Sequence, residues 1–243
     1  MTTLVRIAVA ALVALFLSSC GFDINLGDFT TGKKGNGKIV TETREITEDF
    51  TEVSASEGLM VYVTQANDFN IEVEADDNII NLIATDIKNG KLRIHARENI
   101  GNATKKVYVS LPEVTALKSS SGSHLQGESI VSSDRLEVDG SSGALIELEL
   151  SVDNLEIDAS SGANLTISGD AEYAEVDVSS GGNINAKDLK TKSCNADASS
   201  GGNVKIQVSE ALTADASSGG NIGYSGNPKV QNKKSLSGSV HHY

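Results

Sequence analysis

Apolar and small residues recur at fixed distances from a repeated glycine. Six such glycines follow a pair of serines, at Gly122, Gly143, Gly162, Gly181, Gly201 and Gly219. The fifth residue before each glycine is Leu117, Val138, Ile157, Val176, Ala196 and Ala214, and the third residue after it is Leu125, Ile146, Leu165, Ile184, Val204 and Ile222. Polar residues alternate with these positions, which is the period of two of a half-buried strand. The pattern predicts two short strands in each segment, one on either side of the glycine.

The Ser-Ser-Gly triplet predicts a tight corner between the two strands. Glycine supplies a positive φ, and serine hydroxyls can satisfy the amides of a turn. Stacked asparagine amides can also bond from one layer to the next, and the second residue past the glycine is Asn164, Asn183, Asn203 and Asn221 in four segments. Degenerate copies of the corner stand at Ser237-Gly238 and, far upstream, at Ser56-Glu57-Gly58.

The repeat length predicts a solenoid. Successive glycines lie 21, 19, 19, 20 and 18 residues apart. A unit this short cannot bury its own apolar face, whereas units stacked on one another bury a continuous core. Each strand then pairs in parallel with its equivalent in the next coil, about 4.8 Å away. We therefore expect an all-β fold, with a single-stranded parallel β-helix of coils of about 19 residues over 113–243.

Residues 38–112 are expected to form an irregular β region. Candidate strands span 38–46, 50–54, 59–65, 70–74, 91–96 and 105–110. Residues 78–87 are a candidate short helix or turn, and Asn89-Gly90 is typical of a hairpin turn. Two interpretations stay open: the region forms early, irregular coils, or it forms a cap that protects an open end of the solenoid.

Acidic residues repeat on the face opposite the predicted core. The fourth residue before the glycine is Asp139, Asp158, Asp177, Asp197 and Asp215, and the sixth is Glu137, Glu156 and Glu175. Neighbouring unit charges at this spacing repel by about 1 kcal/mol in water, and Lys118 and Lys234 take the aspartate position at the two ends. Three interpretations stay open: a solvated face that discourages aggregation, aspartate hydrogen bonds to the corner serines or amides, and a face that binds divalent cations or another ligand.

These acids do not predict an active site. A catalytic pair of carboxylates needs one acid whose environment differs from that of its neighbour, and here the acids repeat coil after coil. Cys194 falls on an inward position, which is typical of a buried, unreactive thiol. We expect no catalytic residues, no bound metal and no cofactor. The formal net charge of -13 argues against a nucleic-acid partner.

The first twenty residues indicate export and lipid attachment. Arg6 precedes an apolar run over 7–17, which is too short to cross a bilayer but has the length of a signal-peptide core. The sequence Leu17-Ser18-Ser19-Cys20 resembles the lipobox of bacterial lipoproteins, in which the cysteine is lipidated and becomes the first mature residue. We expect a signal peptide at 1–19, a lipid anchor at Cys20 and a flexible tether over 20–37.

Several segments together resemble a known family. They are the lipoprotein signal, Phe50-Thr51-Glu52-Val53, Leu59-Met60-Val61-Tyr62-Val63, and the sequence Asp-Ala-Ser-Ser-Gly-Gly-Asn at 197–203 and 215–221. The first copy departs from this consensus at Lys118 and His124. Over about 46–230 the chain resembles the bacterial envelope family described as "putative auto-transporter adhesin, head GIN domain". The resemblance implies a right-handed β-helix and transfers no catalytic residues.

Three functions follow as hypotheses. The first is a non-catalytic, lipid-anchored envelope protein with adhesin-like binding of a protein or glycan. The second is a periplasmic structural or envelope-stress component, and the third is a polysaccharide-active β-helix enzyme. The third is disfavoured because the chain has 4% aromatic residues and no tryptophan. Expected partners are the outer membrane, through Cys20, an unidentified ligand, and a second copy of the chain in a homo-oligomer.

Overall fold

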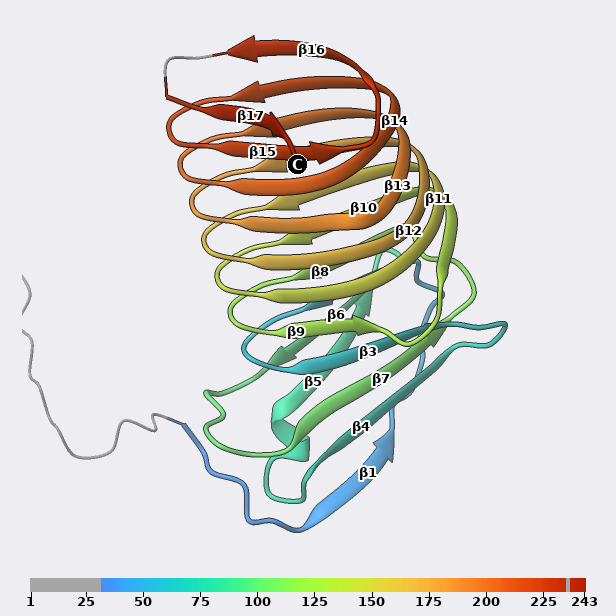
Figure 1. Cartoon of the computed structure of the whole chain (residues 1–243). Helices are drawn as coiled ribbons and strands as arrows, with labels where there is room; N and C mark the ends of the chain where they lie inside the picture. Colours follow the sequence, from blue (N-terminus) through green and yellow to red (C-terminus); the bar gives the residue numbers. More distant parts are fainter. Residues whose placement is uncertain (1–31, 235–236) are drawn as a thin grey trace, which may run out of the picture. The chain divides into compact units, whose positions relative to one another are not determined.

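The computed structural model describes residues 32–234 and 237–243 (Figure 1). The expected signal peptide, Cys20 and residues 20–31 of the expected tether lie outside the described residues. The described part forms 17 strands and one short 3-10 turn, and all strands belong to one continuous sheet. It contains no helix with the length and apolarity needed to cross a membrane. The all-β prediction is therefore confirmed.

The repeats form a parallel solenoid, as the alternation predicted. Its strands are β8 (Ala116–Ser119), β9 (His124–Gly127), β10 (Val131–Gly140), β11 (Leu145–Ala159), β12 (Asn164–Val178), β13 (Asn183–Ala198), β14 (Asn203–Ala216), β15 (Asn221–Ser225), β16 (Lys229–Lys234) and β17 (Ser239–His242). Each strand pairs in parallel with the strand one coil away, for example Leu145 with Asn164 and Ala159 with Val178. Figure 1 shows these strands stacked as successive coils.

The segment between one corner and the next differs from the prediction. We expected two short strands and a polar return, but β11, β12, β13 and β14 each run almost without a break from one corner to the next. The return is itself hydrogen-bonded to its equivalents in neighbouring coils, so its polar residues are the outward side of a bent strand. One coil of the solenoid is therefore one long, curved strand and one corner.

The core is a set of stacked inward ladders. The residues five before the corner glycine are buried in every coil, and Val138, Ile157, Val176, Ala196 and Ala214 are each at most 1% exposed. Burying a valine or isoleucine side chain contributes about 1.5–3 kcal/mol. The side chains of this ladder become smaller from Ile157 to Ala214, so the core of the solenoid is packed with smaller side chains toward its C-terminal coils.

The corners use two left-handed residues rather than one. Gly162 has φ of 76°, as expected for the glycine, but Ser161 before it also has φ of 50°, and every Ser-Ser-Gly corner repeats this pair. The amide of Gly162 donates to the carbonyl of Ser180 in the next coil at 3.2 Å. The glycine amides of the corners are thus satisfied by backbone carbonyls of the neighbouring coil, and in the first corner the amide of Ser120 also donates to a serine hydroxyl, Oγ of Ser123, at 3.2 Å.

The asparagine ladder is confirmed over three coils. The side-chain amide of Asn203 donates to Oδ1 of Asn183 at 2.7 Å, and that of Asn221 donates to Oδ1 of Asn203 at 2.7 Å. Asn164 differs, because its amide donates to the carbonyl of Gly162 within its own corner at 3.2 Å. These bonds tie the later coils together beside the corner.

An early coil lies far upstream of the other repeats. Strands β2 (Glu52–Ala55) and β3 (Met60–Gln65) flank a corner in which Glu57 and Gly58 have φ of 62° and 68°. Strand β2 pairs in parallel with β8, and β3 pairs in parallel with β9. The degenerate copy at Ser56-Glu57-Gly58 is therefore a true coil, separated from the next one by a long insertion.

The insertion forms both a further coil and a cap, so each interpretation of this region holds for a part of it. Strands β6 (Lys91–Ala96) and β7 (Lys105–Leu111) pair in parallel with β2 and β3. Antiparallel strands β1 (Ile39–Thr43), β4 (Asn70–Asp76) and β5 (Ile83–Lys88) then cover this end, β4 on β7 and β5 on β6. Figure 1 shows them at the end of the solenoid opposite β16 and β17.

The helix or turn expected over 78–87 holds for its first half only. Asn78 and Ile79 lie in a turn and Ile80–Leu82 forms a 3-10 turn, η1, whereas residues 83–87 belong to β5. The turn buries Ile79 and Ile80 in the core. The hairpin turn at Asn89-Gly90 is confirmed, because both residues have positive φ, 54° and 74°, between β5 and β6.

Candidate functional site

The aspartates predicted to form a column do so. Asp139, Asp158, Asp177, Asp197 and Asp215 stand in register on consecutive strands, on the opposite side of the chain from the buried ladder. Lys118 precedes Asp139 in this register, as expected. At the other end the prediction is one residue off, because Lys233, not Lys234, is in register with Asp215. We call the five aspartates the acidic column.

The column changes the acidity of Asp158. Partial burial, and then the charges of Asp177 and Asp139, raise the pKa of Asp158 to about 6. The glutamates beside the column are partly neutralised at its early end: Lys118 bonds Glu137, and Arg135 Nη2 lies 3.1 Å from Oε2 of Glu156. Although burial lowers the pKa of Lys118, the hydrogen bond and charge of Glu137 raise it overall. Repulsion along the column is therefore real but limited.

Two other sequence predictions concern the thiol of Cys194 and metal binding. Cys194 lies in the inward ladder, 3% exposed, and burial raises the pKa of its thiol to about 12, so the expectation of a buried thiol is confirmed. Over residues 32–234 and 237–243, no three His, Cys, Asp or Glu side chains are grouped so that they could hold a metal ion.

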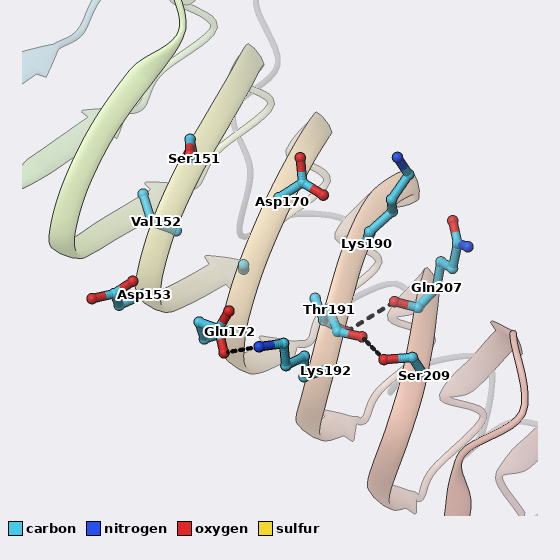
Figure 2. A pocket seen from close by; sticks show the side chains of 11 residues that line it. Ser151, Val152, Asp153, Asp170, Glu172, Lys190, Thr191, Lys192, Gln207 and Ser209 are labelled. Atoms are coloured by element: carbon cyan, nitrogen blue, oxygen red, sulfur yellow. Dashed lines mark hydrogen bonds and ion pairs between the residues drawn. The ribbon is translucent and has the colours of Figure 1, made fainter.

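A hollow that the sequence did not predict lies where the long strands bend. It measures about 410 Å³ and crosses β11, β12, β13 and β14 (Figure 2). Two outward rows border it. One row is Ser151, Asp170, Lys190 and Gln207, and the other is Asp153, Glu172, Lys192 and Ser209. Between them lie the buried residues Val152, Ala171 and Thr191. We call this hollow, with these rows, the bend groove.

Irregular register shapes the bend groove. Strand β13 carries extra residues relative to both neighbours, and the pairing shifts between Thr166 and Ser168 on one side and between Ala186 and Lys190 on the other. Gly169 precedes the groove with φ of 106°, and a Cβ there would lie 2.0 Å from the carbonyl oxygen of Leu150. Only glycine lets the strand turn this close to the coil below. The groove is thus a built feature of the backbone.

Some polar side chains of the groove form hydrogen bonds or ion pairs within the protein, and others do not. Lys192 Nζ lies 2.6 Å from Oε2 of Glu172, across β13 and β12. Thr191 Oγ1 donates to the carbonyl of Gln207 at 2.8 Å, and Ser209 Oγ donates to that of Thr191 at 3.1 Å. The dashed lines of Figure 2 mark these contacts. They hold one end and the floor of the groove in a fixed geometry.

The chemistry of the groove does not repeat from coil to coil. The acidic column, the asparagine ladder and the corners carry the same residue on successive coils. In the groove one row instead reads Ser, Asp, Lys, Gln and the other Asp, Glu, Lys, Ser. Outward residues also vary elsewhere, as along Glu147, Thr166, Asn185 and Lys205, but in the groove varied charged and polar side chains line a hollow of about 410 Å³. The bend groove is therefore the strongest candidate for a specific binding site.

The sequence pattern does not predict this groove, because the repeat is regular only close to the glycine. The signal available was the unequal coil length, 19, 20 and 18 residues over the last full coils, together with the loss of strict alternation around Asp170. Insertions in a stacked repeat must bulge outward somewhere. Their position relative to the bend was not deducible from spacing alone.

The described residues thus form a parallel β-solenoid that is closed at one end by a cap of antiparallel strands. The chain belongs to the family described as "Putative auto-transporter adhesin, head GIN domain", whose model matches residues 49–228. The matched residues run from just before β2 through the coil of β15. The resemblance found in the sequence is thereby confirmed.

Solved structures of Bacteroidetes proteins share this fold. A putative adhesin from Bacteroides fragilis superposes with a TM-score of 0.79 at 18% identity, covering 87% of this chain and 100% of that one. A putative adhesin from Parabacteroides merdae gives 0.71 at 22% identity, covering 87% and 99%. A putative lipid binding protein from Parabacteroides distasonis gives 0.69 at 19% identity, covering 88% and 100%. A search of curated proteins found no match to this chain.

Proposed function

We propose that this protein is a lipid-anchored component of the bacterial cell envelope that binds a ligand without converting it, as an adhesin does, through the bend groove. The observation that carries the proposal is a hollow of about 410 Å³ lined by a non-repeating set of charged and polar side chains along four consecutive coils. The lipobox ending at Cys20 and the family membership support the envelope setting.

The architecture suits binding by a preformed surface. The groove residues stand on strands paired to both neighbours, and the Glu172–Lys192 ion pair and the Thr191 hydrogen bond fix its floor and one end. A rigid site loses little conformational entropy when a ligand binds. A solenoid on a tether would present such a face away from the membrane.

The acids of the column support a structural role. The raised pKa of Asp158 has its causes in burial and in the neighbouring aspartates of the same column. A glycosidase acid is tuned by its environment in a comparable way, so the polysaccharide-active alternative needs its own test. Turnover of uronate or neutral glycans by the wild-type protein, abolished in Asp158→Asn, would overturn the non-catalytic proposal. We expect no turnover by either protein.

Anchoring and exposure are tested on cells. The expected result for Cys20→Ser is loss of lipid labelling and release from the membrane fraction. Protease added to intact cells should then degrade the anchored wild-type protein if it acts as a surface adhesin. Protection until the outer membrane is broken would instead favour the periplasmic structural alternative.

Binding through the groove is tested by attachment. Cells carrying Asp170→Ser with Lys190→Ser should attach at least tenfold less to surfaces coated with glycans, matrix proteins or sister cells. A matched control is Asp188→Ser with Lys205→Ser, which removes the same charges from exposed positions outside the groove and outside the acidic column. Equal attachment by the two double variants would contradict the proposal.

A further inference from the structure

We infer that the ligand of the bend groove is a short zwitterion of the amino-acid or peptide type, with its ammonium group on Asp170 and its carboxylate on Lys190. This inference rests on the proposed function, since it names the ligand class of the same groove.

Two equivalent acid–lysine pairs span β12 and β13 in the groove, and only one of them is closed. Glu172 and Lys192 form an ion pair of 2.6 Å. Asp170 and Lys190 are in register on the same two strands, and both are exposed. Within the part of the chain that the structure describes, neither of these two side chains forms a hydrogen bond or an ion pair. Figure 2 shows them at the end of the groove opposite the closed pair, with both side chains extended away from the ribbon.

An open pair of opposite charges is complementary to a ligand that carries both charges. A ligand with an ammonium group alone would satisfy Asp170 but face the charge of Lys190, and an anion alone would face Asp170 and Asp153. The chain has a formal net charge of -13, and the groove has three carboxylates against two ammonium groups. The field of the whole protein therefore disfavours strongly anionic ligands. A zwitterion pairs with both groups and carries no net charge against this field.

The spacing of the pair sets the length of the ligand. Adjacent strands of a sheet lie about 4.8 Å apart, so a ligand that pairs with both side chains where they extend side by side should carry its two charged groups about that far apart. An extended peptide advances about 3.3–3.6 Å per residue. A dipeptide therefore bridges the pair better than a single amino acid, whose two charges are too close together. A cavity of about 410 Å³ has room for such a molecule.

Calorimetric titration of the full-length, detergent-solubilised protein with glycylglycine tests the inference. We expect saturable binding with one site per chain. Glycine should bind at least fivefold more weakly, because its charges cannot reach both partners. N-acetylglycylglycine and glycylglycinamide, which each lack one charge, should bind at least tenfold more weakly. Binding of either blocked dipeptide as tightly as glycylglycine would overturn the inference.

Variants locate the binding. Asp170→Asn and Lys190→Gln should each weaken glycylglycine binding at least tenfold, while the exposed controls Asp188→Asn and Lys205→Gln should leave it unchanged. The double variant Asp170→Lys with Lys190→Asp restores an open pair of opposite polarity and should recover most of the affinity. Unchanged binding in Asp170→Asn, with the fold verified by circular dichroism, would place the dipeptide elsewhere and overturn the inference.

The results also separate this inference from the proposed function. If none of these dipeptides binds but the groove variants still lose cell attachment, the ligand class is wrong and the groove retains its role. If glycylglycine binds as expected but cell attachment does not depend on the groove, the ligand class stands and adhesion fails.

Discussion

The most informative single perturbation of the solenoid is removal of one charge from the acidic column. Asp158 lies between Asp139 and Asp177, and its pKa of about 6 in the folded chain exceeds the ordinary value of 3.8. The difference of about 2.2 corresponds to about 3 kcal/mol at most, at 1.36 kcal/mol per pKa unit. Because the side chain is only half-buried, solvent screening reduces this to about 1 kcal/mol.

The sign of the effect follows from proton linkage. The folded chain holds the proton of Asp158 more tightly than the unfolded chain does, so folding gains from protonation. The stability that protonated Asp158 contributes is fully present below about pH 3.8 and is lost as the pH rises through about 6. The variant Asp158→Asn mimics the neutral form at all pH values. It should be more stable than the wild type by about 1 kcal/mol at pH 8 and equally stable near pH 3.5.

Urea unfolding at pH 3.5 and pH 8 measures this difference. The matched control is Asp188→Asn, which removes a carboxylate 71% exposed and 3.8 Å from Lys187, outside the column. The control should change the free energy of unfolding by less than about 0.5 kcal/mol at both pH values. High salt should shrink the effect at Asp158, because screening weakens repulsion. A loss of stability in Asp158→Asn at pH 8, or a gain equal at both pH values, would refute the electrostatic account of the column.

Three further predictions concern the corners, the amide ladder and the core thiol. Gly162→Ala should lower the free energy of unfolding by about 1 kcal/mol through its left-handed backbone alone. Gly182→Ala should lower it by about 1–3 kcal/mol, because the added Cβ would lie 2.6 Å from a backbone oxygen of the coil below. Thermal unfolding compares the two variants, and equal losses of stability would contradict the distinction. Asn203→Ala breaks two side-chain hydrogen bonds and should lower the free energy of unfolding by about 1–2 kcal/mol, more than Asn164→Ala, which breaks one. Equal losses of stability in urea titrations would argue against the ladder. Cys194 should react with a thiol reagent only after unfolding, since burial raises its pKa to about 12; rapid labelling of the native protein would contradict this.

The repeating parts of the molecule were predictable from the sequence, because they obey a single local rule. Alternation around the glycine identified the buried ladder from Val138 to Ala214, and equal spacing then placed the aspartates in one column. The early coil at Gly58 was also recognisable from its corner, although more than sixty residues separate it from the next Ser-Ser-Gly glycine, Gly122. Stacking makes such positions equivalent, so local pattern determines tertiary position.

The parts that were not predictable depend on contacts between coils. Strand β5 does not alternate clearly, and its pairing with β6 decides its conformation. Ser161 takes a left-handed conformation that serine does not favour, because the corner bonds the next coil through its backbone. The bend groove arises where inserted residues of β13 must be accommodated beside shorter neighbours. Register shifts of this kind leave little trace in composition or periodicity.

The assignment of the groove depends most on Asp170, Lys190 and Gln207 standing on three successive strands. Engineered cysteine pairs measure this directly, in a chain with Cys20→Ser and Cys194→Ala. The pair at 170 and 190 lies one strand spacing apart, about 4.8 Å, within the range that a disulfide spans, whereas the pair at 170 and 207 lies about 9.6 Å apart and exceeds the limit of about 7 Å. The account predicts that mild oxidant closes the first pair within one chain and leaves the second pair reduced. Rapid closure of the pair at 170 and 207, or none at 170 and 190, would contradict it.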